Sequence, residues 1–545
     1  MIAGPTRGRL RGLYLLLVSA LCVAHVHAQS TPATAGQSLF RLGILPSNEP
    51  LTAKRESNLE SNLKISGADA ACANCHRRSG LGEIDGHIRI PPISGPYLFH
   101  SPANGANQVP LIDSMHPERG PYTDATLARA IREGIDADGR PLDYLMPRYD
   151  LSDADMAILI DYLRGMTPAK VPGVSGSELH LATIITPDAD PLARKGMLDV
   201  LGQFFKDKDE AAASSGVSSV GASQRMVFKI DRRWRLHVWE LTGPPATWEQ
   251  QLRDHLKREP VFAVISGVGG GTWEPVHRFC EQAALPCLLP NVDLPVVAEH
   301  DYYSLYFSRG VLLEADLIAS ALAGSAGRIV QVYRGGDIGE QAAQRMSVAA
   351  AAAGLQTVDR KLGSGGAQRE LAHALRDVGS HDALLLWLRP TDLVSLEDLP
   401  AVKSKVFISG LMGGLEHSPM PPQWRDIARI AYPVDLPEKR RTRMDYAMGW
   451  FRLRGIPVVD ERVQADTYVA CEMLDQTLNH MATAIFRDYL VEHLEHMLES
   501  QLVTGYYPRL ALAPNQRFAS KGGYIVHFAG PTGARVLADG DWMVP

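Results

Sequence analysis

The feature that most constrains the fold is an alternation of short apolar segments with longer amphipathic ones, which begins near residue 178. Apolar runs such as LHLATIIT, VFAVISG and RIVQVYRG are each followed by a stretch with helical periodicity. Strands that alternate with helices predict βαβ units, and therefore parallel sheets with helices on both faces. Because roughly 365 residues exceed one ordinary sheet domain, we expect two α/β lobes between 178 and 545.

The residues before this alternation predict a separate, all-α domain at 38–166. The middle of this region is rich in Gly and Pro, and its end is the segment SDADMAILIDYLRGM. Met156, Leu159 and Leu163 recur there with the spacing of a helix that buries one face. The stretch at 167–177 is polar and contains Pro and Gly, which indicates an exposed linker between the two predicted domains.

The N-terminus has the pattern of an export signal. Three arginines precede the 12-residue apolar run LYLLLVSALCVA, and Val26 and Ala28 fit a cleavage site after Ala28. A bilayer span needs roughly 18 or more apolar residues, so an uncleaved anchor is the weaker reading. A lipid on Cys22 is also the weaker reading, because Leu21 is too large for the usual small residue before a lipidated cysteine. We therefore expect a signal peptide at 1–28, a disordered lead-in at 29–37, a periplasmic location and no membrane span in the mature chain.

The charge of the chain argues against one class of partner. Its formal net charge is −6, with 61 acidic and 55 basic residues. Nucleic-acid binding needs a surplus of Lys and Arg against the phosphates. We therefore expect no nucleic-acid partner.

A second strong constraint is the run ACANCHRR at 71–78, where two cysteines three residues apart are followed directly by a histidine. On one helical turn Cys72 and Cys75 face the same side, so both can form thioether bonds to one porphyrin. His76 would then lie beside the iron as an axial ligand. A zinc site, a redox dithiol and a structural disulfide are the alternatives, although no second Cys or His pair of matching spacing follows nearby.

The predicted cofactor is thus one covalent haem c, and its second axial ligand is predicted to be Met146. This residue lies in the loop GRPLDYLMPRYDLSD, just before the helix at the end of the domain. A thioether ligand favours Fe(II) and raises the reduction potential relative to a second histidine. The competing candidates are Met115, His87, His100 and His116.

Three separated motifs, CANCH, PPISG and MPRYDLSDADMAILIDYL, resemble class I c-type cytochromes over residues 65–166. The resemblance implies that a backbone carbonyl of Pro91 or Pro92 accepts a hydrogen bond from His76, which tunes the ligand. It also suggests that Arg77 and Arg78 pair with haem propionates. The long loop between PPISG and Met146 has no clear counterpart in that family.

Residues 178–545 resemble the type I periplasmic binding proteins, which include the branched-chain amino acid receptors. The resemblance lies in the order of the units, such as VFAVISGVGGGTWEPVHRFCEQAALPCLLPNVDLP and GRIVQVYRGGDIGEQAAQRM. It implies two lobes joined by crossing strands, with a cleft at the carboxyl ends of the strands.

A glycine-rich loop at the start of a helix is the predicted anchor of this cleft. Free N–H groups at a helix N-terminus hold anions, and glycines allow a ligand to approach the backbone closely. The loop residues concerned are Ser266, Gly267, Gly269, Gly270, Gly271 and Thr272; a plain flexible turn is the alternative. The position of other residues in the family pattern adds Asn291, Asp293, Arg309, Asp337, Trp387 and Arg389 as cleft candidates.

Two cysteines in the α/β region lie close in sequence. Cys280 and Cys287 are seven residues apart across a helix-to-strand turn, and in an oxidising compartment they predict a disulfide. Cys471 is left without a predicted partner, in a segment that predicts a buried helix.

A haem with two strong axial ligands has no vacant site, so its expected task is outer-sphere electron transfer. The leading hypothesis is therefore an exported electron carrier, not an enzyme, whose second module binds a solute or docks a redox partner. That partner is predicted to be a quinoprotein dehydrogenase or another cytochrome, by analogy only. The alternative is a solute receptor of an ABC importer with an accessory haem, and a haem peroxidase is the third reading.

Overall fold

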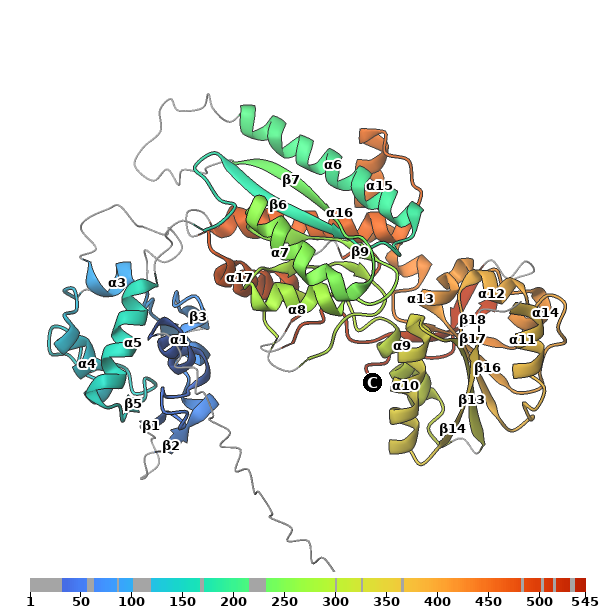
Figure 1. Cartoon of the computed structure of the whole chain (residues 1–545), viewed down its shortest axis with the longest axis horizontal. Helices are drawn as coiled ribbons and strands as arrows, with labels where there is room; N and C mark the ends of the chain where they lie inside the picture. Colours follow the sequence, from blue (N-terminus) through green and yellow to red (C-terminus); the bar gives the residue numbers. More distant parts are fainter. Residues whose placement is uncertain are drawn as a thin grey trace, which may run out of the picture. The chain divides into compact units, whose positions relative to one another are not determined.

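The computed structural model shows two compact units (Figure 1), one made of residues 1–74 and 122–163 and the other of 75–121 and 164–545. The residues that the structure describes are 32–55, 63–85, 88–100, 119–166, 171–214, 232–298, 301–324, 327–363, 367–481, 485–500, 504–512, 516–529 and 535–545. The predicted signal peptide at 1–28, and the competing ligands His87, Met115 and His116, lie outside these ranges. No helix among the described residues is long and apolar enough to cross a membrane.

The first unit combines helices with a small sheet, so its description as all-α needs correction. Strands β1 and β5 pair antiparallel, and β2 completes a three-stranded sheet in the order β2-β1-β5. These strands are only two to four residues long and carry few apolar residues. The sequence therefore shows no alternation of apolar and polar residues that would predict them. The elements are α1 (Pro32–Leu42), β1 (Thr52–Arg55), β2 (Leu63–Ser66), α4 (Asp124–Glu133), β5 (Arg148–Tyr149) and α5 (Asp153–Gly165).

Helix α1 corrects a second expectation, because it begins at Pro32, inside the segment expected to be a disordered lead-in. Leu39 and Phe40 are fully buried, and the Phe40 ring lies 5.5 Å from the ring of Tyr162 on α5. The burial of these two side chains offsets the conformational entropy that is lost when the small residues before them become helical. Helix α5 itself is confirmed, with Met156, Leu159, Ile160 and Leu163 all buried.

The segment from 75 to 121 belongs to the second unit, although the sequence places it in the first domain. It contains the end of α2 (Ala73–His76), β3 (Glu83–Asp85), β4 (Ile88–Ile90) and α3 (Gly95–Phe99). Its described part packs on the C-terminal half of the chain. The N–H of Ser79 donates to the Glu492 carboxylate over 3.0 Å, and Leu81 packs with Phe486 and Tyr489.

The rest of the second unit contains two α/β lobes, as the alternation predicts. Lobe 1 has a parallel sheet in the order β11-β9-β6-β8-β10-β12, with β7 paired to β6. Its strands are β6 (Glu178–Ile185), β7 (Arg233–Glu240), β8 (Ala263–Ile265), β9 (Val268–Gly269), β10 (Cys287–Leu288), β11 (Asn291–Val292) and β12 (Ser304–Leu305). Its helices are α6 (Pro191–Ser214), α7 (Trp248–Arg258), α8 (Glu274–Gln282), α15 (Pro437–Arg454), α16 (Glu461–Met481) and α17 (Arg487–Ser500).

Strand β6 shows why lobe 1 has helices on both faces of its sheet. Leu181 and Ile185 pack into the cluster that contains α6, whereas Ala182 and Ile184 pack into the cluster that contains α7 and α8. Successive side chains of a strand point to opposite faces, so a strand buried on both sides is apolar almost throughout. The sequence LATII in β6 meets that requirement, and Figure 1 shows the strand between the two helical layers.

Lobe 2 repeats this architecture and ends with an antiparallel addition. Its sheet runs β14-β13-β15-β16-β17-β18-β19, parallel through β17 and antiparallel at the last two pairings. In Figure 1 its sheet lies between α9 and α10 on one side and α11, α12 and α14 on the other. Its strands are β13 (Arg328–Arg334), β14 (Gln356–Leu362), β15 (Ala383–Trp387), β16 (Lys405–Ser409), β17 (Ala428–Tyr432), β18 (Tyr524–Ala529) and β19 (Arg535–Ala538), and its helices are α9 (Val311–Ala321), α10 (Ile338–Ala352), α11 (Ala367–Ala374), α12 (Pro390–Val394), α13 (Gly410–Gly413) and α14 (Pro422–Arg425).

Three segments connect the lobes: 306–310 between β12 and α9, 433–436 between β17 and α15, and the described parts of the chain between α17 and β18. They are tied to one another by backbone hydrogen bonds, such as Asp435 N–H to the Tyr506 carbonyl over 2.8 Å. The rings of Phe307 and Tyr507 stack with centroids 5.3 Å apart. The crossing segments therefore form one hinge, and the carboxyl ends of the lobe 1 strands face it.

Candidate functional site

A cavity of about 10 Å³ lies at the hinge between the lobes, roughly the room that one water molecule needs. Its polar lining comes from strand β11 and its flank, from the first and third crossing segments, and from the first turns of helix α16. The polar residues concerned are Asn291, Asp293, Ser308, Arg462, Asp466 and Tyr507. The structure thus shows a closed cleft, and a larger solute would enter only if the lobes moved apart.

Beside this cavity, Ser266 at the end of β8 is locked into a buried polar network. The Asn291 side-chain amide donates to the Ser266 hydroxyl over 2.8 Å and to the Thr467 hydroxyl over 3.2 Å. The two hydroxyls are themselves 3.1 Å apart, and both residues are completely buried. Ser266 therefore joins the sheet of lobe 1 to helix α16 and does not point a free hydroxyl into the cleft.

Two acceptor atoms in the cavity lining have no donor among the described residues. These are Oδ1 of Asn291, a side chain that is 7% exposed, and Oδ1 of Asp466, which is 1% exposed. Burial raises the pKa of the Asp466 carboxyl to about 7, against the opposing charge of Arg462. A buried acceptor without a donor costs free energy, so a donor from a bound molecule would be favoured here.

The charged groups around the cavity are paired across elements. Arg462 on α16 donates to the Asp293 carboxylate over 3.0 Å, and that carboxylate helps to raise the pKa of the guanidinium. Asp293 also acts at a distance on Glu314, a fully buried acid at the start of α9 whose pKa burial raises to about 8. The polar lining of the cavity therefore contains two acids, Asp293 and Asp466, and one guanidinium.

The glycine-rich loop differs from the predicted anion cradle. The Asp188 carboxylate already lies against the backbone N–H groups of this loop. The Gly270 N–H donates weakly to Asp188 Oδ1 over 3.4 Å. A Cβ added at Gly270 would lie 2.2 Å from the Asp188 carbonyl oxygen, so the close approach of the two backbone segments requires glycine there. The Thr272 hydroxyl accepts the Glu274 N–H over 3.3 Å and so serves the first turn of α8. An anionic solute would meet the charge of Asp188 here.

Arg389 connects the two lobes across the mouth of the cleft. Its guanidinium donates to both carboxylate oxygens of Asp337 over 2.7 and 2.8 Å, within lobe 2. The same guanidinium donates to the Gly270 carbonyl of lobe 1 over 2.8 Å. Such a bond is charge-assisted, and it helps to hold the lobes closed.

Two of the predicted cleft residues lie elsewhere. The Arg309 guanidinium pairs with Asp316 of α9 over 2.8 Å. Trp387 is 1% exposed, and its indole N–H donates to Gln331 over 2.9 Å in the core of lobe 2. Both occupy the expected position at a strand end or crossing, but neither lines the cavity.

Besides Ser308 of the first crossing segment, the sequence reasoning missed five residues of the site: Asp188, Arg462, Asp466, Thr467 and Tyr507. Asp188 follows β6 at its carboxyl end, as cleft residues do in such sheets, and that position was a usable signal. The other four come from α16 and from the last crossing segment. No local pattern relates them to residues near 290, because only the tertiary fold brings them together.

Comparisons with solved structures place this arrangement among known folds. A fatty acid ABC transporter substrate-binding protein from Thermomonospora curvata matches with a TM-score of 0.50 at 16% identity, covering 69% of this chain and 95% of that chain. A substrate-binding periplasmic protein from Ralstonia solanacearum matches with a TM-score of 0.50 at 15% identity, covering 66% and 100%. A substrate-binding protein of an ABC transporter from Aeropyrum pernix matches with a TM-score of 0.50 at 14% identity, covering 68% and 96%.

The α/β lobes have the type I periplasmic-binding-protein fold. No family model matches the chain, and no curated protein matches it. The matches cover almost the whole length of the solved proteins and about two thirds of this chain.

His76, at the end of helix α2, is buried beside the proline-containing loop. Its ring is 6% exposed, and Nδ1 lies 3.0 Å from the Pro91 carbonyl oxygen. This confirms the predicted contact with the proline-containing loop, and it leaves Nε2 as the ring atom for a metal. Burial lowers the pKa of His76 to about 4, so the imidazole is neutral at physiological pH, which is the form that binds metals.

The neighbouring basic residues have protein partners. Arg77 forms an ion pair with Glu83 over 2.5 Å, and the Arg78 guanidinium lies 4.0 Å from the ring centroid of Tyr302. Cys72 and Cys75 lie just before and within the turn of α2, and both are partly exposed. Met146 lies in the loop before β5, in the first unit, and its role as the second axial ligand stays a prediction.

Cys280 and Cys287 lie together in the core of lobe 1 as free thiols. A side-chain hydrogen bond joins them, and burial raises the pKa of Cys280 well above its ordinary value. The two thiols are therefore close neighbours, and the disulfide between them stays a prediction. Cys471 is buried in α16, as expected.

Proposed function

We propose that this protein is a receptor that binds a small solute between the two lobes of its periplasmic-binding-protein fold. The observation that carries this proposal is the pair of buried acceptors, Asn291 Oδ1 and Asp466 Oδ1, in the lining of the hinge cavity. The solved proteins with this fold are named as substrate-binding proteins of ABC transporters. Those names motivate the proposal, and the polar groups of the cavity indicate which kind of solute would bind.

The cavity chemistry favours a solute with a cationic, donor-rich group, such as an amine. Asp293 and Asp466 supply negative charge, and the two unpartnered acceptors need N–H or O–H donors. Asp188 near the glycine-rich loop works against an anionic solute at that end. The Arg389 bond to Gly270 would close the lobes over the bound molecule, as hinge closure does in this kind of fold.

Calorimetric titration of the full chain with a panel of amines and amino acids tests this proposal. We expect one site per chain, and an affinity that increases as the pH rises through about 7, because Asp466 then becomes ionised. Asp466→Asn removes the charge of one acceptor and should weaken binding about 10- to 100-fold. Asp475→Asn is the matched control, because Asp475 lies on the same helix and pairs with Lys208 over 2.5 Å. Equal affinities of the two variants would contradict the assignment of the site.

We also propose that the chain carries one covalent haem c and transfers electrons through it. Cys72 and Cys75 would hold the porphyrin, and His76 would bind the iron through Nε2. The buried, neutral imidazole fixed by Pro91 supports this proposal. When bound, the haem supplies a one-electron couple; Pro91 fixes the ring of His76, and its carbonyl makes the imidazole a better ligand. The partner would be a redox protein of the same exported compartment, such as a quinoprotein dehydrogenase or another cytochrome.

Replacing both Cys72 and Cys75 by serine should remove the covalent haem. Serine cannot form the thioether bonds, so acid-acetone extraction of the variant should release any pigment, whereas the unmodified protein should keep its colour in the precipitate. The measurement is a pyridine haemochrome spectrum after export in cells that mature c-type cytochromes. Replacement of Cys280 and Cys287 by serine is the control, because these cysteines lie in the core of lobe 1. A colourless unmodified protein would contradict the haem proposal.

A further inference from the structure

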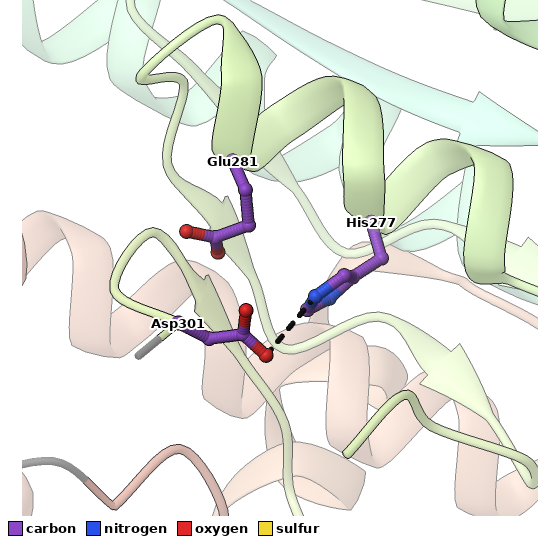
Figure 2. A group of neighbouring side chains, drawn as sticks. All are labelled: His277, Glu281 and Asp301. Carbon is purple, nitrogen blue, oxygen red and sulfur yellow. Dashed lines mark ion pairs between the residues drawn. The ribbon is translucent and has the colours of Figure 1, made fainter. Parts of the chain in front are cut away.

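We propose that His277, Glu281 and Asp301 bind one divalent cation of the Zn²⁺ type, at a site in lobe 1 that is separate from the solute cleft. Figure 2 shows the three side chains pointing toward one another. One ligand atom from each lies within 4.8 Å of the others. An imidazole nitrogen with carboxylate oxygens is a donor set that Zn²⁺ accepts.

The backbone brings these groups together from two elements. His277 and Glu281 are four residues apart on α8, so both lie on the same face of this helix (Figure 2). Asp301 lies on the segment that leads into β12. Both oxygens of the Glu281 carboxylate accept backbone N–H groups of this segment, from Tyr302, Tyr303 and Ser304, over 2.8 to 3.2 Å. Glu281 therefore fixes Asp301 opposite the helix.

The geometry of the His277 ring suits a metal ligand. Nε2 lies 3.1 Å from Asp301 Oδ2, and two ligands at metal bond lengths of about 2.0–2.2 Å are separated by roughly this distance. The other ring nitrogen, Nδ1, lies 2.8 Å from the Tyr306 hydroxyl. The Tyr306 ring is in turn stacked on Phe518, with centroids 5.6 Å apart. A polar group on the far nitrogen is the usual support of a metal-binding histidine.

The charge of the cluster is the independent reason to expect a cation. Side-chain exposures are 6% for His277 and 12% for Asp301. Within the described ranges, no Lys or Arg forms an ion pair with Glu281 or Asp301. Among the described residues, only the backbone N–H groups that bond to Glu281, and the imidazole beside Asp301, offset the negative charge of the two carboxylates. A divalent cation would neutralise it and would join α8 to the segment before the first lobe crossing.

The full chain, freed of metal with a chelator, should bind one Zn²⁺ in calorimetry and unfold at a higher temperature with ZnCl₂. His277→Ala should weaken this binding by more than about 100-fold, since even supporting groups beyond the ligands contribute about 10- to 100-fold. Asp301→Asn is the second variant. It keeps the shape of the site and the contacts of Glu281, so its expected loss of Zn²⁺ does not depend on a disturbed fold.

His237→Ala is the matched control. His237 and His180 form a histidine pair elsewhere in lobe 1. Nε2 of His237 lies 2.9 Å from Nδ1 of His180, and Glu259 and Glu178 lie nearby. If Zn²⁺ bound there, only His237→Ala would lose it, and the proposal would be wrong. It would also be wrong if the unmodified chain bound no Zn²⁺, which would leave His277 and Asp301 as a plain ion pair. Because this readout uses metal alone, its failure would leave the proposed solute binding untouched.

Discussion

Changing Arg440 to leucine should lower the free energy of unfolding by about 3–5 kcal/mol, because it leaves a buried carboxylate without its partner. Arg440 on α15 is 3% exposed, and its guanidinium forms an ion pair with Glu416. It also donates to the Tyr432 hydroxyl and to the Asp435 carbonyl, over 2.8 Å each. Its guanidinium carbon lies 4.0 Å from the ring centroid of Tyr506. The network joins β17, α15 and two of the lobe crossings.

The electrostatics of Glu416 explain the size of this effect. Burial alone would raise the pKa of the Glu416 carboxyl, but the charge of Arg440 and the Tyr432 hydroxyl hold it below its ordinary value. Without the guanidinium, a charged Glu416 would remain in an apolar setting. The measurement is urea unfolding of the full chain, followed by tryptophan fluorescence. Arg535→Leu, which breaks the exposed pair with Glu438, is the control and should leave the midpoint almost unchanged. Equal midpoints of both variants would contradict this account.

Changing Glu314 to glutamine should stabilise the protein at pH 8 and have little effect at pH 5. Burial raises the pKa of this carboxyl to about 8, although the Ser409 hydroxyl and the Leu411 N–H donate to it. Its pKa in the fold therefore lies above its ordinary value of 4.5. The stability that the protonated acid contributes is therefore complete below pH 4.5. It is lost as the pH rises from there to about 8. In this window each pH unit costs about 1.4 kcal/mol.

Thermal unfolding at pH 5, 6.5 and 8 measures this effect as a difference between the variant and the unmodified protein. All other titratable groups contribute equally to the pH dependence of both proteins, so their contributions cancel in the difference. Glu438→Gln is the control, since Glu438 is exposed and its replacement should give a difference that does not grow with pH. If the Glu314→Gln difference stayed constant between pH 5 and 8, the acid would be ionised in the fold and the argument would fail.

The α/β architecture could be predicted from the sequence because its signals are local. A parallel strand buried on both faces, such as β6 or β15, must be apolar almost throughout, and that pattern can be read without the fold. The antiparallel pairings of β18 and β19 carry no such signal. Helix α1 was missed because its first residues lack apolar periodicity, and its large buried side chains are Leu39 and Phe40.

The cleft could be predicted only in part, because a position at a strand end does not fix where a side chain points. Arg389 and Asp293 face the cleft, whereas Trp387, two residues before Arg389, points into the core of lobe 2. The acceptor of the site that matters most, Asp466, comes from α16, far along the chain. Asn291, which lines the same cavity, was predicted, but only the tertiary structure brings it near Asp466.

For the Cys-x-x-Cys-His segment, the sequence predicts the candidate residues but not where the chain after them packs. The motif can be read from five residues of the sequence, and the structure adds the burial of His76 and its Pro91 contact. The sequence did not reveal that the segment after the motif packs within the second unit. Glu492 accepts both the Ser79 N–H and the Tyr302 hydroxyl, over 3.0 Å each, and burial raises its pKa to about 7. Within the second unit, the residues that follow the motif are thus held against helix α17.

Native mass spectrometry of the full chain, exported and purified without a denaturing step, is the most direct test of solute binding between the lobes. The account predicts a population heavier than the bare chain by the mass of one small molecule. Unfolding should remove this extra mass, and the Asp466→Asn chain should show much less of it. A single mass that corresponds to the chain with its covalent groups alone, unchanged after incubation with the amine panel, would contradict the account.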